Sequence, residues 1–179
     1  MTQTARIYGD SLYDLAKEER LTDSIFAHMQ DVRQIFAENP TYRRLLAEPS
    51  IPMKERTGLL EQAFGGKIEA YLLNFLMILC ENGLLMEYEG CCQQYQARYY
   101  KDRNIAIATV TSAVALTPEQ SAKLKLRLEQ KCGKRVILTY KVSPSVIGGL
   151  RIELEGKLID GTVAGRLSGL NKKLKEVII

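Results

Sequence analysis

The sequence predicts an α+β fold, in which a six-helix bundle over residues 1–104 is followed by a small α+β module over residues 105–179. Apolar residues recur at helical spacing as far as residue 104, and alternate with other residues along strands from Ile105 onward. The charge changes at the same place. Residues 1–104 hold 12 lysines and arginines against 15 acidic residues, whereas residues 105–179 hold 13 against 6. Both changes indicate two units with different partners.

Six helices are expected in the first unit. Apolar stripes predict the first two, one through Tyr8 and Leu12 and one from Ile25 to Phe36. Prolines and glycines bound the next two, which are expected over residues 40–46 and from Pro52 to Phe64. Residues 67–81 are apolar nearly all the way round, which predicts a fifth helix at the centre of the bundle. The sixth is expected from about Leu84 to Arg103, after the stop at Asn82-Gly83.

The second unit is expected to run strand, helix, strand, hairpin, helix. A strand begins at Ile105, and Thr117-Pro118-Glu119-Gln120 forms a capping box for a helix that ends at Cys132-Gly133. A second strand follows from Val136, and residues 150–159 form a hairpin around Gly156. Residues after Thr162 predict a final helix whose apolar face comprises Val163, Leu167, Leu170, Leu174 and Val177.

The composition indicates a soluble globular protein without an obvious catalytic or metal centre. Hydrophobic residues make up 46% and charged residues 26% of the chain, no signal peptide is recognisable, and the apolar run 70–80 is too short to span a bilayer. The cysteines match no zinc or thioredoxin spacing, so reduced thiols of a cytosolic protein are favoured over redox or metal chemistry. His28 has no second histidine beside it, which disfavours a metal site or a catalytic dyad. We therefore expect a binding protein that needs no cofactor.

Other functions have to be weighed against a binding protein of this kind. Gly148-Gly149 leads into a strand, whereas a phosphate-binding loop needs a helix after its glycines. Tyr95, Tyr99 and Tyr100 lie beside basic residues and could stack on nucleic-acid bases. The helical spacing of Tyr95 and Tyr99 favours packing between helices instead. A nucleic-acid-binding adaptor that uses the basic second unit remains the main alternative, and an enzyme of another type the second.

Motifs at opposite ends of the chain resemble one known family. Gly148-Gly-Leu-Arg-Ile152 and Ile159-Asp-Gly-Thr-Val-Ala-Gly-Arg-Leu167 are similar to the C-terminal signature of the delta subunit of F-type ATP synthases, the family of the mitochondrial oligomycin-sensitivity-conferring protein. Residues 5–16 resemble the opening helix of that family. The chain departs from the pattern at Gly9, where alanine is usual, and at Leu84, where arginine is common.

The resemblance implies a non-catalytic stator subunit on the cytoplasmic face of the bacterial cell membrane, present in one copy per complex. The N-terminal bundle would hold the N-terminal helix of an alpha subunit, and the second unit would meet the b subunits of the peripheral stalk. Nucleic acid would not be a partner, and the chain would not insert into the membrane. The subunit would resist the torque of the rotor during proton-driven ATP synthesis.

The resemblance also implies site residues. Positions that match the alpha-binding groove, between the first and fifth helices, are Tyr8, Ser11, Ile78 and Asn82. Tyr8 could instead be a core residue, because it shares an apolar stripe with Leu12. A second set is expected to shape the C-terminal unit and to touch no substrate: Gly148, Gly149, Asp160 and Gly161. Asp160 is expected to cap the final helix.

Overall fold

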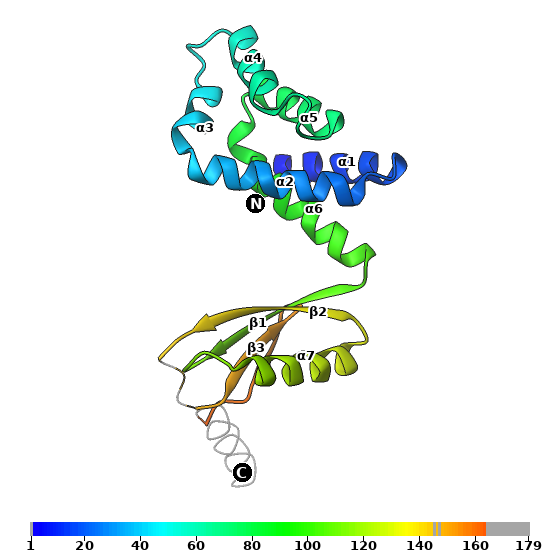
Figure 1. Ribbon diagram of the computed structural model, residues 1–179, viewed down its shortest axis with the longest axis vertical. Helices are drawn as coiled ribbons and strands as arrows, with labels where there is room; N and C mark the ends of the chain where they lie inside the picture. Colours follow the sequence, from blue (N-terminus) through cyan, green and yellow to red (C-terminus); the bar gives the residue numbers. More distant parts are fainter. Residues whose placement is uncertain (1, 145, 147, 164–179) are drawn as a thin grey trace, which may run out of the picture. The chain divides into compact units, whose positions relative to one another are not determined.

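The protein is α+β, as the sequence predicts. A computed structural model describes residues 2–144, 146 and 148–163 (Figure 1). The chain divides into two compact units, unit 1 (Met1–Tyr99) and unit 2 (Tyr100–Ile179). The boundary between the units lies inside the helix Tyr88–Asp102, and unit 2 begins five residues before the change of sequence pattern at Ile105.

Unit 1 is helical throughout its described length. Its elements are α1 (Gln3–Glu18), α2 (Thr22–Glu38), α3 (Pro40–Ala47), α4 (Met53–Phe64), α5 (Ala70–Glu81), the 3₁₀ turn η1 (Leu85–Glu87) and α6 (Tyr88–Asp102). The fifth helix begins three residues later than predicted, because residues 65–69 form a turn after α4. One apolar core joins all of these elements, and its largest fully buried side chain is Tyr95.

Tyr95 and Tyr99 of α6 pack inside unit 1, as their spacing predicts. The Tyr95 hydroxyl donates a hydrogen bond to the Thr22 carbonyl at 3.0 Å. The ring of Tyr99 stacks on Phe26 with 4.3 Å between centroids, and its hydroxyl donates to Asp23. These rings are engaged by α2, so they do not form an open platform for bases.

The prediction that α5 lies at the centre of the bundle is wrong. Leu72, Leu76 and Leu79 are fully buried, but Tyr71 and Ile78 on the same helix are 37% and 38% exposed. A helix that is apolar on all sides is expected to be buried on all sides, which was the basis of the prediction. Within the described residues, one side of α5 has no covering element, and that side forms the groove described below.

Gly9 marks a close approach of α1 to α6. A Cβ atom at this position would lie 2.8 Å from the Cys91 carbonyl oxygen and 2.8 Å from the Cβ of Gln94. Real Cβ atoms do not come so near, so either helix would have to shift. In this chain the packing of α1 against α6 leaves no room for the methyl group of alanine, the residue that is usual in the family at this position.

We expect Gly9→Ala to destabilise the protein by about 1–2 kcal/mol. Alanine gains about 1 kcal/mol of helix propensity, but forcing an extra methyl into a packed interface costs about 1–3 kcal/mol. The matched control is Gly58→Ala in α4, where a Cβ meets nothing within 4 Å. The control should raise stability by up to about 1 kcal/mol. Urea unfolding of both variants measures the difference, and two variants of equal stability would contradict the close approach.

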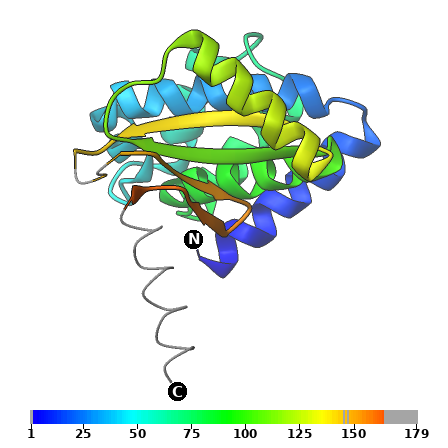
Figure 2. The same cartoon turned by 90° about the horizontal axis from the view of Figure 1, so that it is seen from below.

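Unit 2 is a four-stranded mixed sheet with a helix on one face (Figure 2). Its elements are β1 (Ile105–Ser112), α7 (Pro118–Cys132), β2 (Arg135–Val142), β3 (Leu150–Leu154) and β4 (Lys157–Asp160), and the strand order is β2-β1-β3-β4. Strands β1 and β2 are parallel, whereas β3 is antiparallel to both β1 and β4. The covered face of β1 carries small residues, Ala106, Ala108 and Val110.

Local signals set the ends of α7. Thr117 accepts a hydrogen bond from the Gln120 amide, and the Gln120 side chain accepts one from the Thr117 amide, so the predicted capping box is confirmed. Gly133 ends the helix with φ of 68°. Glu155 and Gly156, both with positive φ, form the two-residue turn between β3 and β4. The predicted final helix lies, apart from Val163, outside the described residues.

Independent folding of residues 1–104 as a six-helix bundle stays a prediction. The core of unit 1 extends from Ala5 to Tyr95 and includes no residue of unit 2. The isolated fragment is therefore expected to give a helical circular dichroism spectrum and a single cooperative melt. A disordered spectrum would contradict the division into two units.

Candidate partner-binding groove

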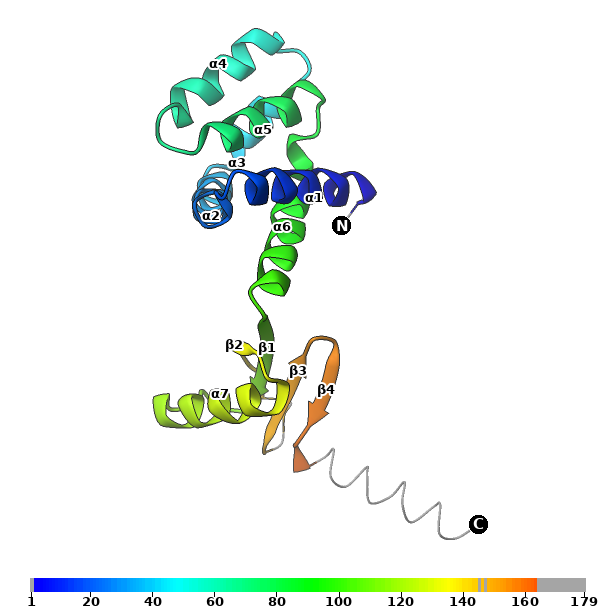
Figure 3. The same ribbon diagram turned by 90° about the vertical axis from the view of Figure 1, so that its right-hand side faces the viewer.

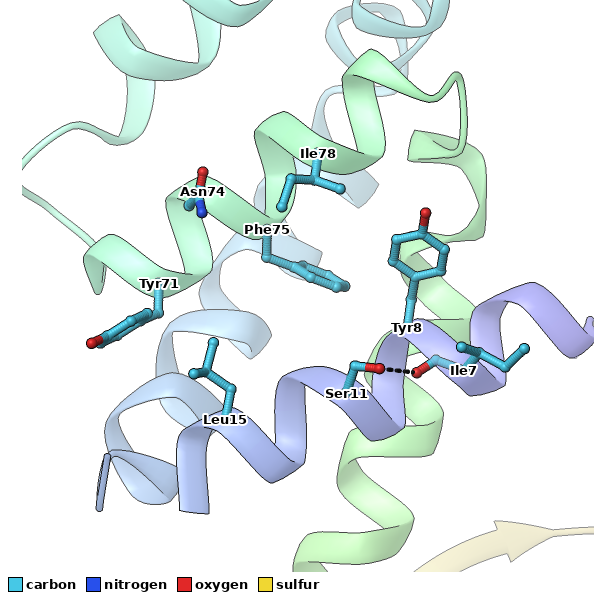
Figure 4. Close-up of a pocket in the computed structure, with 8 residues that line it drawn as sticks. All are labelled: Ile7, Tyr8, Ser11, Leu15, Tyr71, Asn74, Phe75 and Ile78. Atoms are coloured by element: carbon cyan, nitrogen blue, oxygen red, sulfur yellow. Dashed lines mark hydrogen bonds between the residues drawn. The ribbon is translucent and has the colours of Figure 1, made fainter. Parts of the chain in front are cut away.

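A groove of about 400 Å³ lies between α1 and α5 of unit 1 (Figure 4). Figure 3 shows the two helices side by side. The groove is lined by Ile7, Tyr8, Ser11 and Leu15 of α1 and by Tyr71, Asn74, Phe75 and Ile78 of α5. Residues at these spacings share one face of a helix. The groove is therefore an open strip between two helical faces.

Most of the lining is apolar and partly open to solvent. Ile7 is 55% exposed, while the rings of Tyr8 and Phe75 meet across the groove with 6.3 Å between centroids. Ser11 donates its hydroxyl to the Ile7 carbonyl at 2.9 Å, so this polar group is satisfied within α1. Asn74 adds an amide to the α5 side. A surface of this kind suits the apolar face of an amphipathic helix.

Buried faces of the same helices hold the two walls. The opposite side of α1 contributes Ala5, Leu12, Tyr13 and Ala16 to the core of unit 1. At the far end of α5, the buried Arg56 guanidinium donates to the Cys80 carbonyl at 3.5 Å. The groove thus rests on packed helices, which favours binding without large rearrangement.

The structure brings three of the four predicted groove residues together. Tyr8, Ser11 and Ile78 line the groove, and Tyr8 also packs against the core, so it fits both roles that the sequence left open. Asn82 does not line the groove. Its side-chain amide donates to the Ile78 carbonyl at 2.8 Å and so caps the end of α5. Binding of a partner by these residues stays a prediction.

Sequence reasoning missed five lining residues, namely Ile7, Leu15, Tyr71, Asn74 and Phe75. The available signal was their spacing, because Ile7, Ser11 and Leu15 recur every four residues, as do Tyr71 and Phe75. The pattern alone does not say which apolar face of a helix remains uncovered.

The glycines of the C-terminal signature have a conformational role. Gly148 and Gly149 have φ of 64° and 83°, in the region that favours glycine. A Cβ on Gly149 would lie 2.4 Å from the Gly161 carbonyl oxygen. Gly161 in turn donates its amide to the Leu150 carbonyl at 2.9 Å. The motif therefore brings the start of β3 against the end of β4, which agrees with the expected role in shape.

Asp160 organises the turn after β4. Its Oδ1 accepts hydrogen bonds from the Thr162 amide at 3.0 Å and the Thr162 hydroxyl at 2.6 Å. Arg151 contacts the other carboxylate oxygen at 3.3 Å. The hydrogen bonds from Thr162, followed by Arg151, lower the pKa of Asp160. The helix that Asp160 was expected to cap lies outside the described residues beyond Val163.

We expect Asp160→Ala to loosen unit 2 locally, while Asp160→Asn, which keeps an acceptor for Thr162, has a smaller effect. Folding lowers the pKa of Asp160, so its carboxylate stabilises the folded state at pH values above the pKa of the unfolded state. This stabilisation is lost as the pH falls through the pKa of the folded state. The difference between wild type and Asp160→Ala should therefore shrink in acid. Amide hydrogen exchange at Thr162 and along β4, measured at neutral and acidic pH, tests this expectation. Equal exchange in all three proteins would contradict it.

Other candidate sites receive no support from the described residues. None of their histidines, cysteines and acidic residues gather in groups of three or more that could hold a metal ion. Burial raises the pKa of the Cys91 and Cys92 thiols to about 12, which keeps them protonated and unreactive. His28 Nδ1 accepts a hydrogen bond from the Glu69 amide. In the part of the chain that the structure describes, no helix is long and apolar enough to cross a membrane.

Comparisons with known proteins agree with this architecture. Residues 4–174 match the family model described as ATP synthase delta (OSCP) subunit. The ATP synthase subunit delta of Gloeobacter violaceus is 32% identical over 96% of this chain and 94% of its own length. That of Lachnoclostridium phytofermentans is 29% identical over 97% and 96%.

A solved structure extends the likeness to the fold. It is a chain in the cryo-EM structure of the Toxoplasma gondii mitochondrial ATP synthase hexamer, with a TM-score of 0.73 at 23% identity. The match covers 97% of this chain and 98% of that chain. From the motifs at both ends and the match along nearly its whole length, the chain belongs to the ATP synthase delta (OSCP) subunit family.

Proposed function

We propose that this protein is the peripheral-stalk subunit of a bacterial F-type ATP synthase, which joins the catalytic head to the stalk. Its family and its relatives, which are named ATP synthase subunit delta, support this assignment. The subunit does no chemistry. It holds the head still against the torque of the rotor, so that rotation drives ATP synthesis.

The groove between α1 and α5 is the observation that carries the proposal. It presents apolar side chains that remain partly exposed, such as Ile7 and Ile78, along two helical faces. Exposed apolar surface of this kind marks a site for a partner. The occupant that we propose is the N-terminal helix of an alpha subunit, which would place apolar residues at spacings i, i+3, i+4 and i+7 in the groove.

Unit 2 supplies the second attachment, to the b subunits of the stalk. Residues 105–179 hold 13 basic and 6 acidic residues, in contrast to the acidic N-terminal part. Two contacts made by one chain reinforce each other, because the first raises the effective concentration for the second. In this arrangement one copy per complex lies on the cytoplasmic face of the cell membrane, attached through the complex.

Reconstitution tests the proposal. Membranes that hold the b subunits but lack both the head and this protein are mixed with purified head, with or without the full-length chain. The protein should restore stable head binding and proton-driven ATP synthesis. Head binding that is equally strong without the protein would overturn the proposal. A nucleic-acid-binding protein would instead show affinity for nucleic acid that falls steeply with salt.

A further inference from the structure

Asn74 interrupts the apolar wall that α5 contributes to the groove. All other residues from Ala70 to Cys80 are apolar or aromatic. Asn74 lies between Tyr71 and Ile78 at spacings of three and four residues, so the three side chains share one face of α5 (Figure 4). Asparagine is a poorer helix former than leucine or methionine, so the stability of α5 does not account for it.

The amide of Asn74 is exposed and has no partner in the part of the chain that the structure describes. Asn39 and Asn82 each donate to the carbonyl four residues earlier, at 3.0 Å and 2.8 Å, whereas Asn74 makes no such bond. The other small polar group of the groove is already satisfied, because the Ser11 hydroxyl donates to the Ile7 carbonyl. Asn74 therefore offers both donors and an acceptor to an occupant of the groove.

The groove has two apolar ends and a polar centre. Figure 4 shows that α1 and α5 run in opposite directions along it. One end is formed by Ile7 and Ile78, and the other by Leu15 and Tyr71. Asn74 and the small Ser11 lie at the middle positions of the two walls. A bound helix therefore places different parts of one face against different chemistry.

A helix that fills the groove removes water from Asn74. If the occupant is apolar at that point, the amide is left without hydrogen bonds, which lowers affinity by about tenfold because a buried unsatisfied polar group is costly. The apolar ends gain from burial under any apolar residue. The ends thus supply affinity, while the centre discriminates among helices. A single buried asparagine fixes the register of coiled coils for the same reason.

We propose that Asn74 determines which helix the groove accepts and in what register. The occupant carries one polar side chain in the middle of its apolar face, with apolar residues three or four positions away on both sides, and that polar side chain pairs with the Asn74 amide. This inference rests on the proposed function, because it takes the occupant to be the alpha N-terminal helix. It adds the chemistry required at one position, and it explains how a wholly apolar stripe is rejected.

A swap of polar and apolar groups tests the proposal. Full-length wild type and Asn74→Leu are titrated with a synthetic peptide of the alpha N-terminal residues from the same organism, and with peptides in which each polar residue is replaced singly by leucine. One replacement should weaken binding to wild type by about tenfold, and Asn74→Leu should weaken binding of the unmodified peptide by about as much. Combining the two leucines should restore affinity to within about threefold of the original pair.

The matched control is Ser11→Ala, which alters the other wall at the middle of the groove. Its hydroxyl is satisfied within α1, so no peptide position should couple to it by more than about threefold. Asn74→Leu should melt at or above the temperature of wild type, because leucine is the better helix former. A loss of peptide binding in this variant is then a change in the contact and not in folding.

The outcomes separate this inference from the proposed function. If the peptide binds Asn74→Leu as tightly as wild type, or if no peptide position couples to Asn74, the amide does not select the occupant and the proposed function stands. If the coupled position responds equally to Ser11→Ala, the effect does not belong to the amide and the inference also fails. If the wild-type chain does not bind the alpha peptide, both the inference and the proposed occupant of the groove are wrong.

Discussion

Replacing Ser11 with tryptophan is expected to weaken binding of the alpha-subunit N-terminal helix by about 100-fold or more, which corresponds to about 2.7 kcal/mol. Ser11 is exposed and lies between Ile7 and Leu15 in the groove. An indole there would occupy much of the 400 Å³ that the partner must enter. Because Ser11 faces solvent, unfolding free energy should change by less than about 0.5 kcal/mol. Calorimetric titration with a synthetic alpha N-terminal peptide, together with urea unfolding, measures both quantities.

Two controls separate the steric effect from other causes. Ser11→Ala removes the hydroxyl, which donates only to the Ile7 carbonyl, but keeps the space, so its affinity should stay within about threefold of wild type. Lys17→Trp places the same indole on an exposed position of α1 outside the groove and should bind normally. If Ser11→Trp binds the peptide as tightly as wild type, the groove is not the alpha-binding site.

Elements with local signals could be predicted from the sequence. The Thr117 capping box begins α7, and Gly133 ends it, because the side chains and backbone that decide these ends are adjacent in the chain. The alternation in residues 150–159 likewise predicts the hairpin, whose turn needs positive φ at Gly156. Such features depend little on the rest of the fold.

Features that depend on distant contacts could not be predicted. The apolar residues all round α5 predict burial, but periodicity does not distinguish a core face from a face kept for a partner. The close approach at Gly9 depends on Cys91, some eighty residues away. Asn82 was placed in the groove by resemblance, yet its position at the end of α5 lets its amide cap Ile78 instead.

Arg56 is a buried cation that is held by backbone carbonyls. It is 8% exposed, and its guanidinium donates to the carbonyls of Ile51 at 3.1 Å, Leu46 at 3.2 Å and Cys80 at 3.5 Å. Leu46 and Cys80 lie in the last turns of α3 and α5. Carbonyls at helix C-termini have no partner within the helix and carry partial negative charge. The guanidinium therefore joins two helix ends, one of them next to Ile78 of the groove.

Arg56→Met is expected to lower the free energy of unfolding of unit 1 by about 3 kcal/mol. Methionine fills most of the space but removes three hydrogen bonds from a charged donor, each of which contributes about 1.5–3 kcal/mol. The Leu46 carbonyl still accepts from the Cys80 thiol at 3.4 Å and the Cys80 carbonyl from the Gly83 amide at 3.2 Å, which limits the loss. Losing the desolvation cost of the cation offsets part of this, as it does when apolar residues replace buried ion pairs.

The matched control for this prediction is Arg44→Met on the exposed side of α3, which should change stability by less than about 0.5 kcal/mol. Urea unfolding followed by the helical circular dichroism signal measures both variants. Arg56→Lys should fall between them, because one ammonium cannot reach all three carbonyls in the geometry of the guanidinium fork. If Arg56→Met is no less stable than Arg44→Met, water replaces the lost donors, and the guanidinium does not hold the ends of α3 and α5 together.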